Sequence, residues 1–175
     1  MDYHTVSSDY LDDDFGYKRY DTKRTDLGEL LYQLKYRSNQ AVVDELVEAA
    51  ATFIESWQPG ADVLVPVPAS RPRATQPVVL LGEKLAARLN LLFAPDWVRR
   101  VREVPELKNV QWRHERLKLL TGVHEVNRAK SQGRRILLFD DVYEDGATLE
   151  SVTEALYDQG GAAEVFALTI TRTRR

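Results

Sequence analysis

The clearest helical pattern of apolar positions lies in the first third of the chain. In "QAVVDELVEAAATFIESW", apolar side chains recur at steps of three and four residues and form one stripe, made by Val43, Leu46, Val47, Ala50, Ile54 and Trp57. The proline and glycine of "QPG" at 58–60 end this pattern. We therefore expect the stretch 27–57 to be helical.

Short apolar runs rich in branched residues predict the strands. The runs "DVLVPVP" at 62–68 and "RILLF" at 135–139 are typical of buried strands in a parallel sheet. "LLFAPDWVRRV" at 91–101 indicates one or two further strands, and "EVFALTITRT" at 164–173 indicates a closing strand. Helices are expected between these strands, over roughly 77–90 and 147–159, with "GG" ending the second. Strands that alternate with helices predict parallel βαβ units and an α/β domain.

Two segments lack a regular pattern. Residues 1–26 are polar, acidic and rich in tyrosine, so we expect a loosely attached arm with a short strand near Phe15–Tyr20. The domain proper would then span 27–175. "REVPELKNVQWRHER" at 102–116 is charged and has no clear period, which predicts a long mobile loop. Loops of this length in compact domains are often functional lids.

Composition narrows the functional classes. Hydrophobic residues make up 43% of the 175 residues, enough for one core, and the formal net charge of -3 does not predict nonspecific binding to nucleic acid or membranes. The chain has no cysteine, which excludes disulfides, thiolate metal sites and thiol catalysis. The acidic start lacks the apolar region of a signal peptide, and no apolar stretch approaches the ~20 residues of a membrane helix. We expect a soluble cytoplasmic protein without a membrane partner.

The segment "RRILLFDDVYEDGATLESV" at 134–152 contains the candidate chemistry. Four carboxylates, Asp140, Asp141, Glu144 and Asp145, lie within six residues and repel one another. In open α/β sheets, ligands bind at the carboxyl ends of the strands, where the two aspartates are expected. Gly146 allows an unusual backbone conformation, so that loop N–H groups and the next helix can bind a phosphate. A sugar phosphate with Mg²⁺ would offset the repulsion, with the carboxylates binding sugar hydroxyls or the cation.

A simpler interpretation of the acidic segment stays open. Acidic residues after a strand often cap the helix that follows them, without binding any ligand. The phosphate-loop pattern GxxxxGK is absent, as is GxGxxG after a strand, which counts against the ordinary nucleotide-binding folds.

"ILLFDDVYEDGATLES" resembles the phosphoribosyl pyrophosphate (PRPP) motif of type I phosphoribosyltransferases: an apolar strand, two acids, a short loop and Thr-Gly-x-Thr. Other segments are similar to the ComF subgroup, the competence-associated phosphoribosyltransferase-like proteins. They are "LGELLYQLKYRSN", "VLVPVPASRPR", "ER" at 115–116 with "TGVHEV", and "GGAAEVFALTITRT". The resemblance covers roughly residues 15–175 and implies the parallel-sheet type I phosphoribosyltransferase fold, a Rossmann-like α/β architecture.

The resemblance implies a role for each matching position. Asp140 and Asp141 would hold the ribose hydroxyls, directly or through Mg²⁺, and Glu144 would be a general base toward the nucleobase. The loop that binds the 5′-phosphate would be Val142, Tyr143, Asp145, Gly146, Ala147 and Thr148. The pyrophosphate would meet the turn of Ala69, Ser70 and Arg71, under a flexible loop that contains Lys108, Arg113 and Arg116. In the family's chemistry, a nucleobase nitrogen displaces pyrophosphate at the anomeric carbon.

The sequence departs from the family pattern at three places. The family usually has Thr or Ser against the phosphate where this chain has Asp145. Two unit charges ~4 Å apart cost about 4 kcal/mol at an effective dielectric near 20, unless the side chain turns to solvent. Leu119 stands where ComF proteins tend to have Asn, and the cysteine-rich N-terminal zinc module is missing.

Three functions remain open on this basis. The first is an active phosphoribosyltransferase of nucleotide metabolism that uses PRPP, or another sugar phosphate, and an unidentified nucleobase. The second is an inactive binding or regulatory module in competence, DNA uptake or DNA processing. The third is a relative that serves only as a structural or interaction protein.

Other features leave further alternatives. Arg71 and Arg73 are pyrophosphate contacts or solvated turn residues. "QWRHER" at 111–116 combines an aromatic with cations, which suits single-stranded nucleic acid, or is an exposed charged loop. Tyr143 stacks on a nucleobase or packs on its own loop. Leu30, Leu31 and Leu34 form part of the core or of a homodimer contact.

Overall fold

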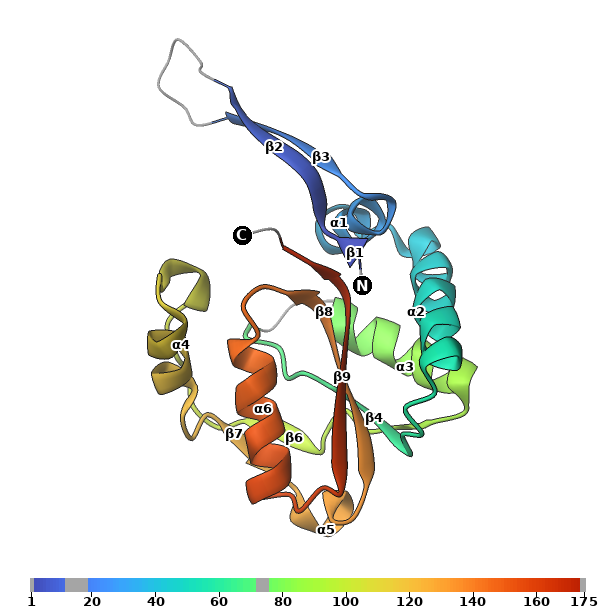
Figure 1. The fold of residues 1–175 in the computed structure, drawn as a ribbon, viewed down its shortest axis with the longest axis vertical. Helices are drawn as coiled ribbons and strands as arrows, with labels where there is room; N and C mark the ends of the chain where they lie inside the picture. The colour runs from blue at the N-terminus through green and yellow to red at the C-terminus, as the bar shows by residue number, and fades with distance from the viewer. Residues whose placement is uncertain (1, 12–18, 72–75, 174–175) are drawn as a thin grey trace.

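The computed structural model describes residues 2–11, 19–71 and 76–173 and shows helices around a central sheet (Figure 1). The strands are β1 (Asp2–Tyr3), β2 (Thr5–Leu11), β3 (Arg19–Arg24), β4 (Val63–Pro66), β5 (Leu92–Phe93), β6 (Val98–Arg100), β7 (His124–Val126), β8 (Arg135–Tyr143) and β9 (Glu164–Arg172). The α-helices are α1 (Asp26–Arg37), α2 (Val43–Trp57), α3 (Pro77–Leu89), α4 (Arg113–Leu120), α5 (Arg128–Ser131) and α6 (Ala147–Asp158). Two 3₁₀ helices are η1 (Gln40–Val42) and η2 (Leu107–Asn109).

The central sheet has five strands in the order β1-β9-β8-β4-β5, and every neighbouring pair is parallel. Two antiparallel pairs, β2–β3 and β6–β7, lie outside it. The predicted α/β architecture with a parallel sheet is therefore confirmed. None of the helices in the described ranges is long and apolar enough to cross a membrane.

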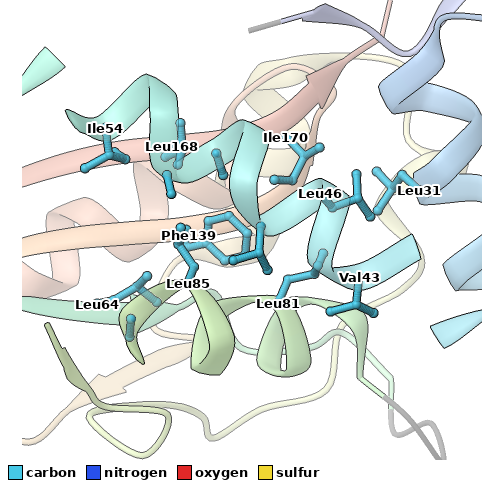
Figure 2. Close-up of a cluster of buried hydrophobic side chains, with 14 of the residues drawn as sticks. Leu31, Val43, Leu46, Ile54, Leu64, Leu81, Leu85, Phe139, Leu168 and Ile170 are labelled. Carbon is cyan, nitrogen blue, oxygen red and sulfur yellow. The ribbon is translucent and has the colours of Figure 1, made fainter. Parts of the chain in front are cut away.

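Alternating side chains of the central strands form two hydrophobic layers. On β8, Leu137 and Phe139 belong to one layer, while Ile136 and Leu138 belong to the other. The first layer packs against α1, α2 and α3 (Figure 2), and the second against α6 and the β6–β7 pair. Both faces of the sheet are covered, which explains why its strands read as continuous apolar runs.

The predicted helix over 27–57 consists of two helices. α1 ends at Arg37, its C-cap Ser38 has the left-handed conformation with a φ of 52°, and Asn39 caps η1 through its side chain. The predicted apolar stripe faces the core in α2, although Trp57 is exposed at its end. Leu31 and Leu34 are fully or almost fully buried in the first layer, so they belong to the core.

One sequence-based expectation fails in its detail, and another cannot be compared with the described residues. The irregular loop predicted over 102–116 is wrong at its end, because α4 begins at Arg113. The pattern gave no signal there, since only Arg116 and Leu120 of this helix are buried. The strand expected near Phe15–Tyr20 falls largely outside the described residues, and β3 begins at Arg19.

The N-terminal residues contact the sheet at its edge. β1 pairs with β9, and the backbone N–H of His4 donates to the carbonyl of Arg172 at 2.7 Å. β2 and β3 form a hairpin that projects from the body (Figure 1). The boundary predicted between residues 1–26 and 27–175 stays a prediction.

Burial of the His124 ring predicts a loss of stability in acid. His124 is 3% exposed, and its Nδ1 lies 3.0 Å from Ser151 Oγ of α6. Burial, helped by the charge of Arg100, lowers the His124 pKa from 6.5 to about 4. The unfolded chain therefore takes up a proton first as the pH falls. We expect the contribution of neutral His124 to the free energy of unfolding to be fully present above pH 6.5. It should fall by up to about 3 kcal/mol between pH 6.5 and 4.

Urea unfolding of the native chain and of His124→Asn over this pH range measures the effect. The variant should lose less stability on acidification, while His114→Asn, at an exposed histidine, serves as the matched control. Equal pH dependence in the native chain and His124→Asn would contradict the prediction.

Candidate functional site

Two adjoining cavities lie at the carboxyl ends of β4 and β8. The larger, of about 500 Å³, is lined by Asp140, Asp141, Glu144 and Thr148 and by the turn 69–71. The smaller, of about 90 Å³, lies within the loop after β8 and is lined partly by Arg116. The fold thus brings together segments that the sequence analysis selected separately, at the edge where α/β sheets bind ligands.

Most of the predicted site residues line one of the two cavities. Ala69, Ser70 and Arg71 line the larger one, and Val142, Tyr143, Asp145 and Gly146 line the smaller one. Ala147 is buried behind the loop, and Arg113 lines neither cavity. The side chain of Lys108 and the whole of Arg73 lie outside the described part of the structure.

β8 extends further than its apolar residues suggested. Its pairing with β9 continues through Asp140↔Thr169 to Tyr143↔Arg172, so the two aspartates lie within the strand rather than after it. The Asp140 carboxylate turns back and accepts a hydrogen bond of 2.8 Å from the N–H of Asp141. The alternation of the strand then places Asp140 and Asp141 in different surroundings.

Gly146 has the backbone conformation that was expected. Its φ of 80° is left-handed, and it directly precedes the first residue of α6. A Cβ at this position would lie 2.9 Å from Cε2 and from the hydroxyl oxygen of Tyr143, so the ring packs on the glycine. Tyr143 therefore packs on its own loop, although 37% of the residue is exposed.

Asp145 is buried and paired, and does not turn toward solvent. Its Oδ1 accepts a hydrogen bond of 3.0 Å from the N–H of Ala147, so it satisfies the first N–H of α6 from the residue before the N-cap, Gly146. Its Oδ2 lies 3.1 Å from Nη1 of Arg116, which also donates to Glu144 at 3.0 Å. The charge that would oppose a bound phosphate is thus balanced inside the protein.

Helix α4 holds the acidic loop from one side. The Arg116 side chain is only 9% exposed, and its Nε donates to the Val110 carbonyl at 2.9 Å. Arg113 donates to the Asp145 carbonyl at 3.1 Å and pairs with Glu150 of α6. Both guanidinium groups of the "QWRHER" segment are therefore bound to the protein's own acids, which leaves less positive charge for a nucleic acid.

Lys35 of α1 was not selected from the sequence, although it belongs to the quoted "QLKYRSN". Its Nζ lies 2.7 Å from Asp141 Oδ2, and the two side chains are 17% and 12% exposed. Burial, followed by the charge of Asp141, raises the pKa of Asp140 to about 7. The backbone hydrogen bond from Asp141 and the charge of Lys35 act in the opposite direction and lower it. Asp141, in contrast, has the ammonium group of Lys35 as a direct countercharge.

Two arginines line the larger cavity. Arg71 is 62% exposed in its side chain and pairs with Glu106. Arg100, at the end of β6, is half-buried, and burial lowers the pKa of its guanidinium. The sequence analysis missed Arg100, because its strand was predicted only as part of the longer run 91–101.

The donor chemistry of the aspartates suits Mg²⁺, which takes one or two carboxylates together with substrate phosphates and water. The described residues contain no group of three or more carboxylate or imidazole ligands that could hold a metal ion alone. Asp141 already has an ammonium group at 2.7 Å. These residues therefore fit an ion that arrives with a phosphate ligand better than one held by the protein alone.

The chain is similar in structure to adenine phosphoribosyltransferases. That of Saccharomyces cerevisiae, solved with adenine and an imino-altritol bisphosphate, gives a TM-score of 0.55 at 17% identity, over 95% of this chain and 84% of the enzyme. That of Thermoanaerobacter pseudethanolicus gives 0.52 at 20% identity, over 94% and 83%. The chain has the type I phosphoribosyltransferase fold.

Its sequence is similar to the competence protein ComFC of Bacillus subtilis (strain 168). The two are 27% identical over 146 residues, which cover 83% of this chain and 59% of ComFC. The chain is a distant homologue of ComFC and matches about three-fifths of its length. No protein-family model matches the sequence.

The Arg116–Asp145 contact predicts a loss of stability when only the cation is removed. We expect Arg116→Met to lower the free energy of unfolding by about 3 kcal/mol, because it leaves the buried Asp145 carboxylate without its countercharge. Arg116→Met/Asp145→Asn should lose less, since the uncompensated charge is gone.

Urea unfolding of these variants at neutral pH measures both losses. Arg99→Met is the matched control, because it breaks a 2.9 Å pair with Glu125 in which both side chains are more than half exposed. That control should cost less than about 1 kcal/mol. Equal losses for Arg116→Met and Arg99→Met would contradict the assigned role.

Proposed function

We propose that this protein binds PRPP, or a closely related sugar phosphate, in the cavities at the ends of β4 and β8 and transfers its phosphoribosyl group to a nucleobase. The observation that carries the proposal is the convergence of the Asp140–Asp141 pair, the loop before α6 and the turn 69–71 on one cavity of about 500 Å³. The fold and the similarity to ComFC support it.

The two cavities suit the two ends of such a ligand. The 5′-phosphate would occupy the smaller cavity beside Gly146, where Thr148 offers a hydroxyl and the start of α6 favours an anion. The pyrophosphate would lie in the larger cavity toward Arg71 and Arg100. The ribose between them would bind Asp140 and Asp141 through its hydroxyls.

The reaction would be a substitution at the anomeric carbon. A nucleobase nitrogen forms the new C–N bond and loses its proton, while the C–O bond breaks and pyrophosphate leaves with the electron pair. Glu144 lines the larger cavity and would accept the proton, held in place by Arg116. Mg²⁺ that arrives with the pyrophosphate would neutralise part of its charge and would not need to be held by Asp140 and Asp141, since Asp141 already has an ammonium group at 2.7 Å.

A second candidate is a binding or regulatory module without catalysis, acting in competence or DNA handling. The contact that favours it is the hydrogen bond that Asp145 accepts from the N–H of Ala147, the first residue of α6, because this N–H is then not available to a phosphate. Arg71 is likewise engaged, by Glu106. In such a module, ligand binding would persist without transfer, or the loop would not bind phosphate.

Calorimetric titration with PRPP tests the proposal. We expect saturable binding by the native chain, and a loss of affinity of at least about tenfold in Asp140→Asn and Thr148→Val, which remove direct ligand contacts. Thr153→Val is the matched control, because Thr153 lies on α6 but lines neither cavity. The affinity of this variant for PRPP should equal that of the native chain. Release of pyrophosphate on adding nucleobases one by one then reports transfer.

The outcomes separate the two candidates. Binding with release of pyrophosphate supports the transferase, and binding without release for any nucleobase supports the module. Binding of PRPP by Asp145→Thr but not by the native chain would identify Asp145 as the group that prevents phosphate binding at this loop. Absence of binding in both the native chain and Asp145→Thr would refute the assignment of this cavity to a sugar phosphate.

A further inference from the structure

Lys35 is a charged group from outside the sheet that reaches into the larger cavity. It lies on α1, whereas the other charged groups of that cavity come from β6, β8 and the segments around 71, 106 and 144. Its Nζ is 2.7 Å from Asp141 Oδ2. Lys35 is therefore at once a partner of the candidate catalytic pair and part of the cavity wall.

The position of Lys35 is fixed by the helix that carries it. Thr25 caps α1 by accepting a hydrogen bond of 3.1 Å from the N–H of Gly28. Leu31 lies one turn before Lys35, and Leu34 directly precedes it. Both leucines are buried in the core, where they are 0% and 4% exposed. The backbone of α1 thus cannot move away from Asp141 without exposing apolar surface, which keeps the ammonium group at the cavity.

Two of the other cations near the aspartates are engaged by acids, while Arg100 of β6 lines the same cavity. Arg71 pairs with Glu106, and Arg116 pairs with Glu144 and Asp145. Within the described ranges, the ion pair formed by Asp140 or Asp141 is the one with Lys35. A lysine side chain therefore balances the charge of this carboxylate pair. Without it, a divalent ion would be needed to screen the carboxylates from the charge of a phosphate ligand.

We propose that Lys35 acts in place of a divalent cation held by the protein. Its ammonium group neutralises Asp141 and offers its remaining N–H donors to the ligand, so sugar-phosphate binding persists without Mg²⁺. This inference rests on the proposed function, because it concerns the same ligand. It differs from the family-based expectation that the two aspartates hold Mg²⁺.

The first test compares PRPP affinity in Mg²⁺ and in EDTA by calorimetry. In the native chain we expect a difference of less than about threefold. In Lys35→Met, affinity in EDTA should fall at least about tenfold, and Mg²⁺ should restore most of it. Lys35→Arg, which keeps the positive charge, should behave as the native chain does.

Lys84→Met is the matched control. Lys84 forms a 2.8 Å ion pair with Asp44, which is a lysine–aspartate pair like Lys35–Asp141. Its side chain, however, is 48% exposed and does not line the cavity. Its PRPP affinity in both buffers should equal that of the native chain. This control separates the loss of a cavity charge from the loss of any lysine.

A second test uses the metal alone and does not depend on the ligand. Mn²⁺, a paramagnetic stand-in for Mg²⁺, is titrated into the native chain and the free ion is followed by electron paramagnetic resonance. We expect no specific site in the native chain and one gained site in Lys35→Met. The native-chain titration remains decisive if removal of Lys35 impairs folding.

The results distinguish failure of this inference from failure of the proposed function. Binding of PRPP by the native chain that is lost in EDTA, or a specific Mn²⁺ site in the native chain, would overturn the inference and leave the sugar-phosphate site intact. No binding of PRPP in either buffer would overturn both, and the Lys35–Asp141 pair would then be purely structural.

Discussion

The need to balance buried carboxylates with positive charge governs the arrangement of the candidate site. Asp141 meets Lys35 from α1, and Asp145 meets Arg116 from α4, with both acids nearly inaccessible to water. A buried charge that loses its partner costs several kcal/mol, far more than an exposed pair contributes. These contacts therefore tie two helices, both of which precede the acidic segment in sequence, to the same edge of the sheet.

The apolar core supplies the frame on which this charge balance acts. β4 and β8 direct alternate side chains into two layers, so their carboxyl ends are held side by side. The core fixes where the turn after β4 and the loop after β8 can lie, but it does not orient their polar groups. Apolar packing thus places the site, and the buried ion pairs give it its local shape.

The parts of the molecule with a strong local period were predictable from sequence. The stripe of α2 and the apolar runs of β4 and β8 follow from local rules, and Gly146 has the conformation its position suggested. Helix α4 was missed because its buried side includes Arg116, an arginine that reads as a solvent-facing residue. The orientations of Asp145 and Asp141 could not be predicted, because each depends on a cation distant in sequence. Local patterns do not encode such contacts.

The pairing of β1 with β9 has a consequence for the order in which the protein assembles. β9 lies between β1 and β8, so strands from the two ends of the described chain must meet before the sheet edge is complete. As the polypeptide leaves the ribosome, α1 emerges long before Asp141 and β9 exist, and contacts of such long sequence separation form slowly. Lys35 therefore gains its partner only after most of the described chain has been synthesised. Under the proposed function, binding of a sugar phosphate would therefore report that this late pairing has formed.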